Sequence, residues 1–442
     1  MAIKVVIVGA GFAGLRLARK LNNKPGFEVL LIDKFNYHQF QPLFYQVATA
    51  ALDASNISFP LRKAFQKSKN VRIRVEEVKR MLPEQKKIVT NTEEIEYDML
   101  ALALGADTNF FGNENMTRYA FPMKSTVEAL QLRHRVIQNF EDALLAKDPH
   151  EIERLMNIVV VGGGPTGVEV SGALAEMKKY VLPKDYPELD FSVMKIYLLE
   201  GGERTLATMS EKSSSDSCRY LSKLGVDVMT KSLVKDYDGR DVLLADGKKI
   251  PAYTLIWAAG IKGNVPEGID ASLVVKGNRI RVNRQNQVES LEGVYVLGDL
   301  AYMETPLWPN GHPQVASVAI QQADVMAENL KRIERKSTSF FDYEYHDKGS
   351  MATVGRNLAV VDIPKPKMHL NGFFAWMIWM GLHLFLILGV KNRIFVFINW
   401  IYNYFTYDQN LRLIFKEFYR PKPQERSAVR NQKQTALENK TV

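Results

Sequence analysis

Cysteine is nearly absent from this chain of 442 residues, in which Cys218 is the only thiol. One thiol cannot form an intrachain disulfide, a CxxC redox pair or a cysteine-ligated iron–sulfur cluster, so enzymes that depend on these groups are excluded. The seven histidines form no recognisable ligand set with it, and we expect no metal site. This cysteine usage fits a reducing compartment.

A signal peptide and a dense basic block are lacking as well. The apolar run Val5–Val8 is too short for the hydrophobic region of a signal peptide, so we expect a protein of the cytoplasm or of the inner side of a membrane. The formal net charge is +9, but no segment is as basic as a nucleic-acid-binding arm, and we expect no nucleic-acid partner. Residues 421–442 are basic and polar, which predicts a disordered tail.

A glycine motif with dinucleotide-binding spacing lies close to the N-terminus. Gly9, Gly11 and Gly14 follow an apolar strand and lead into a helical stretch, and a second apolar strand ends at Asp33. In such a βαβ unit the glycines allow a tight turn and a close approach to a pyrophosphate at the helix N-terminus. The acid accepts hydrogen bonds from ribose hydroxyls.

The same spacing recurs at Gly162, Gly164 and Gly167, with an apolar strand before it and a helix after it. The next strand ends at Glu200, and we expect residues 181–191, which contain two prolines, to form a loop that accounts for the longer distance. A glutamate here bonds the ribose 2′-hydroxyl and repels a 2′-phosphate, which favours NADH over NADPH.

Two such units predict two nucleotides, a flavin that stays bound and a nicotinamide that exchanges. A late apolar strand ends in Gly298-Asp299, whose carboxylate and amides suit the ribityl and phosphate groups of a flavin. We therefore predict an α/β fold with two Rossmann-like dinucleotide-binding domains, for FAD and NADH, and a C-terminal helical region that attaches to a membrane.

With these motifs the chain resembles the flavoproteins that have two dinucleotide-binding domains, a pattern to which the turns at Gly105 and Gly260 also belong. Relatives that work through cysteines, such as disulfide and sulfide:quinone reductases, do not match a chain with one thiol. Residues 37–62, 312–323 and 372–376 are similar to type II NADH:quinone oxidoreductases, single-subunit NADH dehydrogenases that pump no protons.

The resemblance implies a hydride transfer from NADH to FAD and a two-electron reduction of a membrane quinone. The cofactor-binding residues that it implies are Gly9, Gly11, Gly14, Asp33, Gly105, Gly298 and Asp299 for FAD, and Gly162, Gly164, Gly167, Glu200 and Gly260 on the NADH side. Glu169 matches a family glutamate near the flavin and the quinone that takes part in proton transfer. The alternative for Glu169 is an ordinary first-turn carboxylate that the helix dipole stabilises.

The family also carries an AQxxxQ motif at the quinone entrance, which residues 316–321 match in part. Gln321 keeps the second glutamine, but Ser317 replaces the first. A serine hydroxyl is shorter and would reach a quinone headgroup only through a water, and Gln321 has the alternative role of a surface amide. The departure leaves the choice between ubiquinone and menaquinone open.

Two apolar segments near the C-terminus predict attachment to a lipid bilayer. Residues 372–390 approach the lower limit of about 17 residues for a membrane span, with His383 near the middle. The second segment, about 393–419, carries a polar stripe at helical spacing, formed by Asn399, Asn403, Thr406 and Asn410, among aromatic residues. We expect monotopic attachment to the cytoplasmic face of the cell membrane, with a buried core helix and a true span as the alternatives.

The expected domain organisation is residues 1–120 and 281–335 for FAD, 121–155 for a helical connection, 156–280 for NADH, 336–420 for membrane attachment and 421–442 for the tail. Two other functions share residues 1–335: a soluble NADH-dependent reductase of a small electron carrier, and an NADH-sensing flavoprotein without enzyme activity. The sequence leaves the oligomeric state open, a homodimer included.

Overall fold

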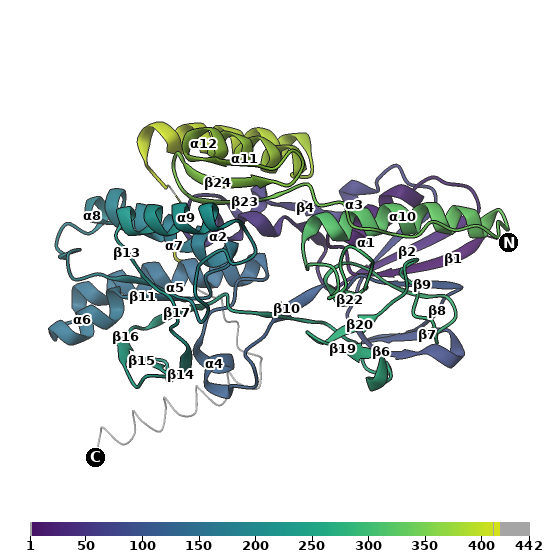
Figure 1. Ribbon diagram of the computed structural model, residues 1–442, viewed down its shortest axis with the longest axis horizontal. Coiled ribbons are helices and arrows are strands. Elements are labelled where there is room, and N and C mark those ends of the chain that lie inside the picture. Colours follow the sequence, from purple (N-terminus) through teal and green to yellow (C-terminus); the bar gives the residue numbers. More distant parts are fainter. Residues whose placement is uncertain (1, 410, 416–442) are drawn as a thin grey trace, which may run out of the picture. The chain divides into compact units, whose positions relative to one another are not determined.

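A five-stranded parallel sheet carries the first glycine motif (Figure 1). The structure is a computed structural model that describes residues 2–409 and 411–415. The strands are, in spatial order, β21 (Val294–Val296), β9 (Met99–Leu102), β1 (Ile3–Val8), β2 (Phe27–Asp33) and β5 (Val71–Val75). One face packs on α1 (Phe12–Leu21) and α10 (Ala316–Glu334), and the other on a sheet of β6 (Val78–Leu82), β7 (Lys87–Thr90) and β8 (Glu94–Glu96). Because both faces are covered, the strand residues Val5 and Val6 are fully buried.

A four-stranded parallel sheet carries the second glycine motif and repeats this plan. Its strands are β13 (Val226–Met229), β12 (Ile196–Leu199), β11 (Ile158–Val161) and β17 (Thr254–Trp257). The helices α7 (Pro165–Tyr180) and α9 (Glu211–Leu224) lie on one face, and β14 (Val234–Tyr237), β15 (Asp241–Leu244) and β16 (Lys249–Pro251) on the other. The fold is therefore the predicted α/β arrangement with two dinucleotide-binding units.

Helices and short strands connect the two units. The helices are α2 (Phe44–Ala48), α3 (Leu61–Ala64), α4 (Glu114–Tyr119), α5 (Thr126–Leu145) and α6 (Pro149–Met156). The strands are β3 (Tyr37–Gln39), β4 (Ser58–Pro60), β10 (Ala106–Thr108), β18 (Ile261–Gly263), β19 (Val274–Val275), β20 (Arg279–Arg281) and β22 (Ala301–Tyr302). Ser125 and Glu128 form a capping box that fixes the start of α5 beside the first sheet. Met1–Arg412 forms one compact unit, and the six expected segments stay a prediction.

The segment expected to be a loop after α7 contains a short helix, α8 (Leu182–Asp185). Pro183 lies at its start, where a missing backbone N–H costs no hydrogen bond. One of the two prolines that predicted a loop therefore lies in the first turn of a short helix.

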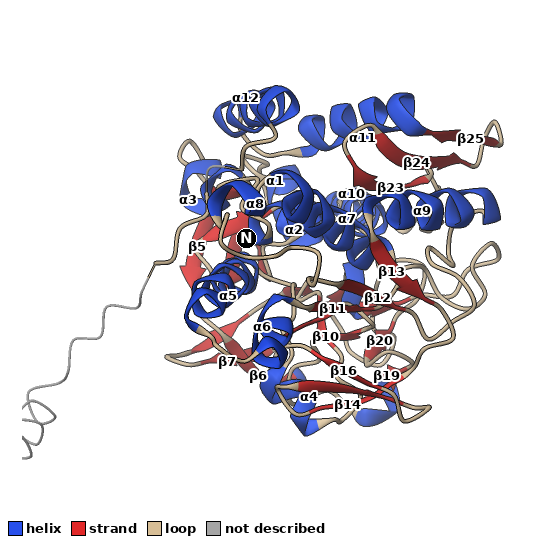
Figure 2. Ribbon diagram, turned by 90° about the vertical axis from the view of Figure 1, so that its left-hand side faces the viewer, coloured by secondary structure: helices blue, strands red, loops and turns tan. Residues whose placement is uncertain are grey.

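A small antiparallel sheet places the C-terminal helices over the second unit (Figure 2). Its strands are β23 (Ser350–Gly355), β24 (Leu358–Ile363) and β25 (Met368–Asn371). One face contacts α7 and α9, and the other contacts α11 (Gly372–Leu386), which is followed by α12 (Val390–Thr406). This sheet was not predicted from the sequence.

The predicted bounds of the two C-terminal segments are wrong. The first helix ends at Leu386, and the second begins at Val390 instead of near residue 393. The second helix ends at Thr406, because Tyr407 adopts a left-handed backbone with φ of 57°. The expected disordered tail and Asn410 lie outside the described residues.

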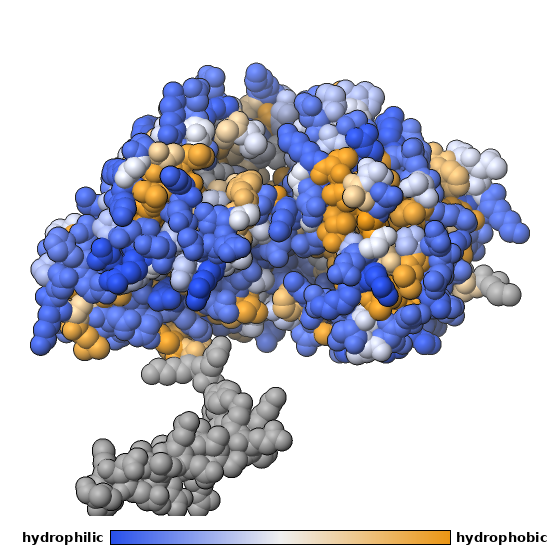
Figure 3. All heavy atoms as spheres, turned by 90° about the horizontal axis from the view of Figure 1, so that it is seen from below, coloured by the Kyte–Doolittle hydropathy of each residue, from blue (hydrophilic) through white to orange (hydrophobic). Residues whose placement is uncertain are grey.

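Of the polar stripe of α12, Asn399 and Asn403 are half-buried against the protein and Thr406 is exposed, and the apolar side of the helix faces outward. Asn403 is half-buried and donates to the Ala51 carbonyl oxygen at 3.2 Å. The outward side chains of α11 and α12 are 40–76% exposed and include Phe373, Phe374, Ile378, Leu382, Phe385, Val390, Ile394, Ile398, Ile401 and Phe405. The face viewed from below in Figure 3 is mostly hydrophilic, with smaller hydrophobic areas. An apolar outward side on both helices is typical of segments that lie in a membrane interface, and the attachment itself stays a prediction.

Across the described part of the chain, we find no helix with the length and apolar character that a membrane crossing requires.

Candidate functional site

The first glycine loop has the geometry that its spacing predicts. Gly9 has φ of +99°, which a residue with a side chain rarely adopts. A Cβ on Gly14 would lie 1.8 Å from the Gly9 carbonyl oxygen, so α1 approaches the strand as closely as a glycine allows. Asp33 accepts hydrogen bonds from the Ala10 amide at 2.6 Å and the Phe35 amide at 2.7 Å. Burial raises the pKa of Asp33, and these two amides oppose the shift.

The second glycine loop repeats these contacts with different residues. Gly162 has φ of +109°, and a Cβ on Gly167 would lie 1.8 Å from the Gly162 carbonyl oxygen. Glu200 accepts from the Gly163 amide at 2.6 Å through one oxygen and from the Gly202 amide at 2.6 Å through the other. The acid at the end of the second strand therefore ties the loop to the sheet in both units. A Cβ on Gly164 would meet no atom within 4 Å, so the backbone faces open space there.

Two adjoining cavities extend from the first glycine loop. The Asp33 cavity has a volume of about 750 Å³ and is lined by Gly9, Gly11, Asp33 and Gly105. The Asp299 cavity has a volume of about 370 Å³ and shares Gly11 and Gly105 with it. A Cβ on Gly11 or Gly105 would meet no atom within 4 Å, so the backbone leaves room for a ligand at both positions. Together the cavities fit an extended dinucleotide whose pyrophosphate lies at the N-terminus of α1.

The Gly298-Asp299 turn closes the inner end of this path. Burial raises the pKa of Asp299, and the charges of Lys124 and Arg279 oppose the shift. The buried Gln322 fixes the turn by accepting from the Gly298 amide at 2.7 Å. Gln322 was missed in the sequence because nothing in a helical glutamine indicates which of its neighbours it bonds.

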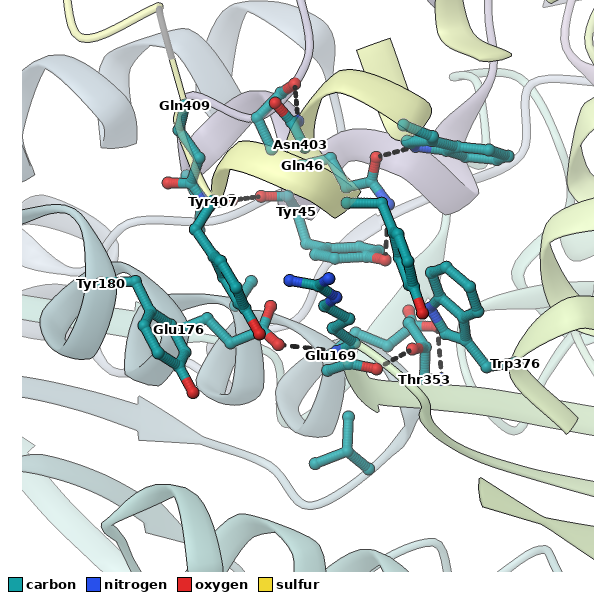
Figure 4. A pocket seen from close by; sticks show the side chains of 18 of the residues that line it. Tyr45, Gln46, Glu169, Glu176, Tyr180, Thr353, Trp376, Asn403, Tyr407 and Gln409 are labelled. Carbon is teal, nitrogen blue, oxygen red and sulfur yellow. Dashed lines mark hydrogen bonds between the residues drawn. The ribbon is translucent and has the colours of Figure 1, made fainter. Parts of the chain in front are cut away.

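A third cavity, in which seven of the 21 lining residues are aromatic, lies beneath the C-terminal helices (Figure 4). This Trp379 cavity has a volume of about 120 Å³, with walls from α2, α7, β23, α11 and α12. Its aromatic lining residues are Tyr45, Tyr180, Trp376, Trp379, Trp400, Tyr404 and Tyr407. Arg356 lies between the rings of Tyr404 and Tyr407, at 4.0 Å from each ring centroid. The cavity therefore suits a flat, largely apolar molecule that carries a few polar atoms.

Glu169 and Tyr45 line both the Asp299 cavity and the Trp379 cavity. Glu169 lies on the first turn of α7 and accepts from the Thr353 amide at 3.4 Å, as Figure 4 shows. Burial raises its pKa to about 8, against the opposing effects of the Thr353 amide and the Trp379 indole. At neutral pH this carboxyl holds a proton between the two cavities.

Ser317 and Gln321 lie on another face of α10. The Ser317 hydroxyl bonds the Tyr345 hydroxyl at 2.9 Å. The Gln321 amide donates to the His346 carbonyl oxygen at 3.0 Å and accepts from the His346 amide at 3.1 Å. Neither residue lines the three cavities described above, whereas Ala316 and Ala319 of the same helix line the Asp299 cavity.

Two histidines and the last glycine of the expected site pack against protein atoms. His38 is buried and bonds the Ala10 carbonyl oxygen at 2.9 Å. His383 stacks on Trp379, and burial lowers its pKa to about 4. Gly260 lies at a β17 turn, where a Cβ would approach the Phe111 ring at 2.9 Å.

Two families of known sequences match the chain. Residues 3–323 match the pyridine nucleotide-disulphide oxidoreductase family, and residues 347–407 match the NDH2 C-terminal domain. The chain is 33% identical over 420 residues to the type II NADH:quinone oxidoreductase Ndh of Mycobacterium tuberculosis, with 90% of this chain and 87% of the relative covered. The type II NADH:quinone oxidoreductase of Staphylococcus aureus is 28% identical over 365 residues, or 80% of this chain and 87% of the relative.

A solved structure of NDH2 from Plasmodium falciparum in complex with NADH has the same fold. It superposes with a TM-score of 0.84 at 21% identity and covers 94% of this chain and 100% of its own. The likeness extends through the C-terminal sheet and helices, because the coverage reaches almost the whole chain.

Proposed function

The chain belongs to the type II NADH:quinone oxidoreductases, and from this membership we propose how its residues oxidise NADH and reduce a quinone. Its cofactors are FAD and NADH. Bound FAD supplies the redox chemistry by accepting a hydride from NADH and passing two electrons to the quinone. The overall reaction converts NADH, a proton and a quinone into NAD⁺ and a quinol. The rival functions, a reductase of a small electron carrier and an NADH sensor, are not favoured.

The observation that carries the proposal is the shared wall of the Asp299 and Trp379 cavities, which Glu169 and Tyr45 form. FAD lies along the Asp33 and Asp299 cavities, and the quinone headgroup enters the Trp379 cavity. The two ligands then meet across one layer of side chains. The aromatic lining excludes water from the quinone and offers ring faces on which a quinone stacks.

NADH binds at the second glycine loop, with Gly164 and Gly167 at the pyrophosphate and Glu200 at the ribose. Both oxygens of Glu200 are already directed by the loop amides, which aligns the carboxylate for a 2′-hydroxyl. Pro165 and Thr166 at the start of α7 are exposed, so this nucleotide has a path for exchange.

Glu169 transfers a proton to the quinone. Its pKa of about 8 leaves it protonated at neutral pH, and the half-buried carboxyl faces both the Asp299 and the Trp379 cavity. Glu169→Gln keeps the size and removes the exchangeable proton. We expect quinone reduction to slow by roughly tenfold to a thousandfold, with NADH oxidation in a single turnover unchanged. In the unsubstituted protein quinone reduction falls as pH rises through about 8, and the variant lacks this dependence.

For Ser317 and Gln321 we propose a supporting role. Their bonds to Tyr345 and His346 hold α10 against the segment that leads into β23. These bonds fix the position of α10, whose Ala316 and Ala319 line the Asp299 cavity.

The outward apolar side of α11 and α12 lies in a lipid surface, which we place on the cytoplasmic face of the cell membrane. Phe374 and Phe405 are 74% and 76% exposed, so replacing both by aspartate removes apolar contact with lipid and little packing. We expect binding to phospholipid vesicles to weaken by tenfold or more, since each ring contributes roughly 1.5–3 kcal/mol when buried.

The matched control for the lipid experiment is Leu145→Asp at the end of α5, where the leucine is 80% exposed. It introduces an exposed aspartate away from the two helices and leaves vesicle binding unchanged. Equal binding of the double variant and the unsubstituted protein would contradict the attachment. Light scattering on the detergent-solubilised samples tests whether the protein is a homodimer.

Rapid-mixing absorbance under anaerobic conditions tests the function itself. NADH bleaches the yellow FAD absorbance, and a water-soluble quinone analogue restores it. Bleaching that a quinone fails to reverse, while a small electron-carrier protein reverses it, would favour the rival reductase.

A further inference from the structure

Tyr45 lies in the wall between the two cavities and has a hydroxyl with a defined orientation. The residue belongs to α2, is 6% exposed, and its ring packs edge-on against Trp379 at a centroid distance of 6.4 Å. Its hydroxyl oxygen accepts a hydrogen bond from Gln46 Nε2 at 2.8 Å. The direction in which the hydroxyl hydrogen points depends on that bond, and hence on the orientation of the Gln46 amide.

Trp400 fixes the Gln46 amide. The indole Nε1 of Trp400 donates to Gln46 Oε1 at 2.8 Å, as Figure 4 shows for the glutamine. An indole nitrogen is a donor only, so the oxygen of the amide must face Trp400 and its NH₂ must face Tyr45. The usual ambiguity between the two ends of a glutamine amide is therefore removed by chemistry.

The Tyr45 hydroxyl is left with a hydrogen to give. Within residues 2–409 and 411–415, no side chain or carbonyl accepts a hydrogen bond from it. Burial and the neighbouring Glu169 charge hold the pKa of Tyr45 well above its usual value, so the phenol keeps its proton at any physiological pH. Tyr45 is thus a permanent donor at the wall of a cavity that lacks its acceptor.

We propose that Tyr45 is a further catalytic residue, which donates a hydrogen bond to a carbonyl oxygen of the quinone, and that Gln46 and Trp400 are positioning residues that aim it. The inference rests on the proposed quinone site. Negative charge grows on the quinone oxygens as the two electrons arrive, and a fixed donor stabilises that charge. Tyr45 retains its proton throughout. Of the two protons that complete the quinol, one arrives with the hydride of NADH and the other comes from solvent through Glu169.

The arrangement links the active site to the lipid-facing helices. Gln46 and Trp400 are 354 positions apart in the sequence, and Trp400 belongs to α12. α12 therefore completes the hydrogen-bonding of the quinone cavity in addition to attaching the enzyme. A displacement of α12 would break the Trp400–Gln46 hydrogen bond, and the Gln46 amide would then no longer orient the Tyr45 hydroxyl.

Tyr45→Phe is the direct test, because it keeps the ring and removes the donor. We expect kcat/KM for a water-soluble quinone analogue to fall by roughly tenfold to a hundredfold, the range for a hydrogen bond to a charged group. FAD content and the rate of bleaching by NADH stay unchanged. An unaltered quinone step in a variant with full FAD content overturns the proposal.

Gln46→Glu changes the orientation of the Tyr45 hydroxyl without changing the packing of the surrounding rings. The new carboxylate accepts hydrogen bonds from Trp400 and from Tyr45 at once, so it turns the tyrosine hydrogen away from the cavity with every ring in place. We expect the same loss in the quinone step as for Tyr45→Phe, and no further loss when the two substitutions are combined. Independent, multiplying losses would overturn the assignment of Gln46 as a positioning residue.

Trp400→Phe provides a second route, because it removes the indole N–H and lets the Gln46 amide rotate. We expect a smaller loss in the quinone step, which disappears when Tyr45 is already Phe. The matched control is Tyr186→Phe, which removes a hydroxyl bonded to Glu141 at 2.9 Å from a buried tyrosine outside the cavities and leaves both steps unchanged.

Failure of the inference and failure of the proposed function give different results. If the unsubstituted protein is bleached by NADH and no quinone restores its absorbance, the proposed function is overturned and the role of Tyr45 with it. If quinone restores the absorbance of the unsubstituted protein and of Tyr45→Phe at equal rates, only the inference is overturned. If Tyr45→Phe does not retain FAD, the Gln46→Glu and Trp400→Phe variants decide by the same criterion.

Discussion

The two glycine loops of this chain have nearly the same backbone but different surroundings. Gly9 and Gly162 have φ of +99° and +109°, and Gly14 and Gly167 allow the same close approach of helix to loop. The first residues of α1 are half-buried or buried, whereas Pro165 and Thr166 at the start of α7 are exposed. The two loops therefore share one backbone design, and under the proposed function the covering segments separate a nucleotide that stays bound from one that exchanges.

The helices that follow the two loops are also covered differently. α1 packs on α10 and is joined to it by side chains, through the Arg16–Asp324 ion pair. α7 packs on β23 through the backbone, because a Cβ on Gly172 would lie 1.7 Å from the Val354 carbonyl oxygen. α10, which packs on α1, belongs to the same dinucleotide-binding unit as α1. β23, which packs on α7, belongs to the sheet that carries the C-terminal helices and lines the Trp379 cavity.

The largest effect should come from alanine at the close contacts within the two loops. Gly14→Ala and Gly167→Ala each place a methyl group against a carbonyl oxygen at 1.8 Å, which neither backbone can accommodate without moving. We expect Gly14→Ala to lose FAD and to lower the free energy of unfolding by about 4 kcal/mol or more. Gly167→Ala should retain FAD and lose bleaching by NADH. FAD absorbance per protein and thermal unfolding measure both.

Gly381→Ala in α11 is the control for both alanine variants, because a Cβ there meets no atom within 4 Å and the site is exposed. Alanine at such a helical position stabilises by roughly 0.5–1 kcal/mol. If Gly167→Ala lost FAD as completely as Gly14→Ala, the two loops would not be separable sites and the comparison would fail.

Gly172→Ala tests the cover of α7. The methyl group would push β23 away from the helix and open the Trp379 cavity. We expect the KM for a quinone analogue to rise by tenfold or more, with FAD content unchanged, since the loss of a packed wall costs at least 1.4 kcal/mol in binding. Steady-state kinetics with the quinone as the varied substrate measure this effect. A changed KM for NADH with an unchanged KM for quinone would contradict this prediction, because it would show that β23 supports the NADH site instead of the Trp379 cavity.

The sequence was most informative where function depends on local spacing. Each glycine motif lies beside a strand and is closed by an acid at the end of the next strand, as predicted, because these contacts are set within some tens of residues. The βαβ pattern is local, so periodicity and glycine spacing are sufficient to identify it.

The Trp379 cavity could not be predicted in the same way. Its walls come from five elements, and bonds such as the one between Trp400 and Gln46 join residues at opposite ends of the chain. The polar stripe of α12 was identified but its direction was not, because periodicity shows that a helix has two faces without showing which one the protein covers. Glu169 was singled out from the resemblance, and its shared position between two cavities required the fold.

Glu200→Arg tests the exchanging site at the level of a single charge. Arginine removes the acceptor for the ribose 2′-hydroxyl and attracts a 2′-phosphate. We expect kcat/KM for NADH to fall by roughly tenfold and that for NADPH to rise, with FAD content unchanged. Glu203→Arg is the matched control, since that glutamate is exposed and pairs only with Lys231 among the described ion pairs. An unchanged preference for NADH in Glu200→Arg would remove the role assigned to the second acid.

The smallest effect should come from Asp324→Asn, which breaks the ion pair between α1 and α10. Arg16 donates to both Asp324 oxygens, at 2.7 and 2.9 Å, but each side chain is more than 30% exposed, so solvent screens the pair. Burial alone would raise the pKa of Asp324, yet the bond and charge of Arg16 lower it below the usual value. The pair therefore stabilises the fold at neutral pH and ceases to do so as pH falls through the pKa of the folded state. We expect a loss of at most about 1 kcal/mol near pH 7 that diminishes as the pH is lowered below the usual carboxyl range, measured by denaturant unfolding as a function of pH. A larger loss of stability, or one that persists in acid, would contradict this prediction. It would mean that the packing of α10 on α1 depends on this ion pair as strongly as the packing of β23 on α7 depends on Gly172.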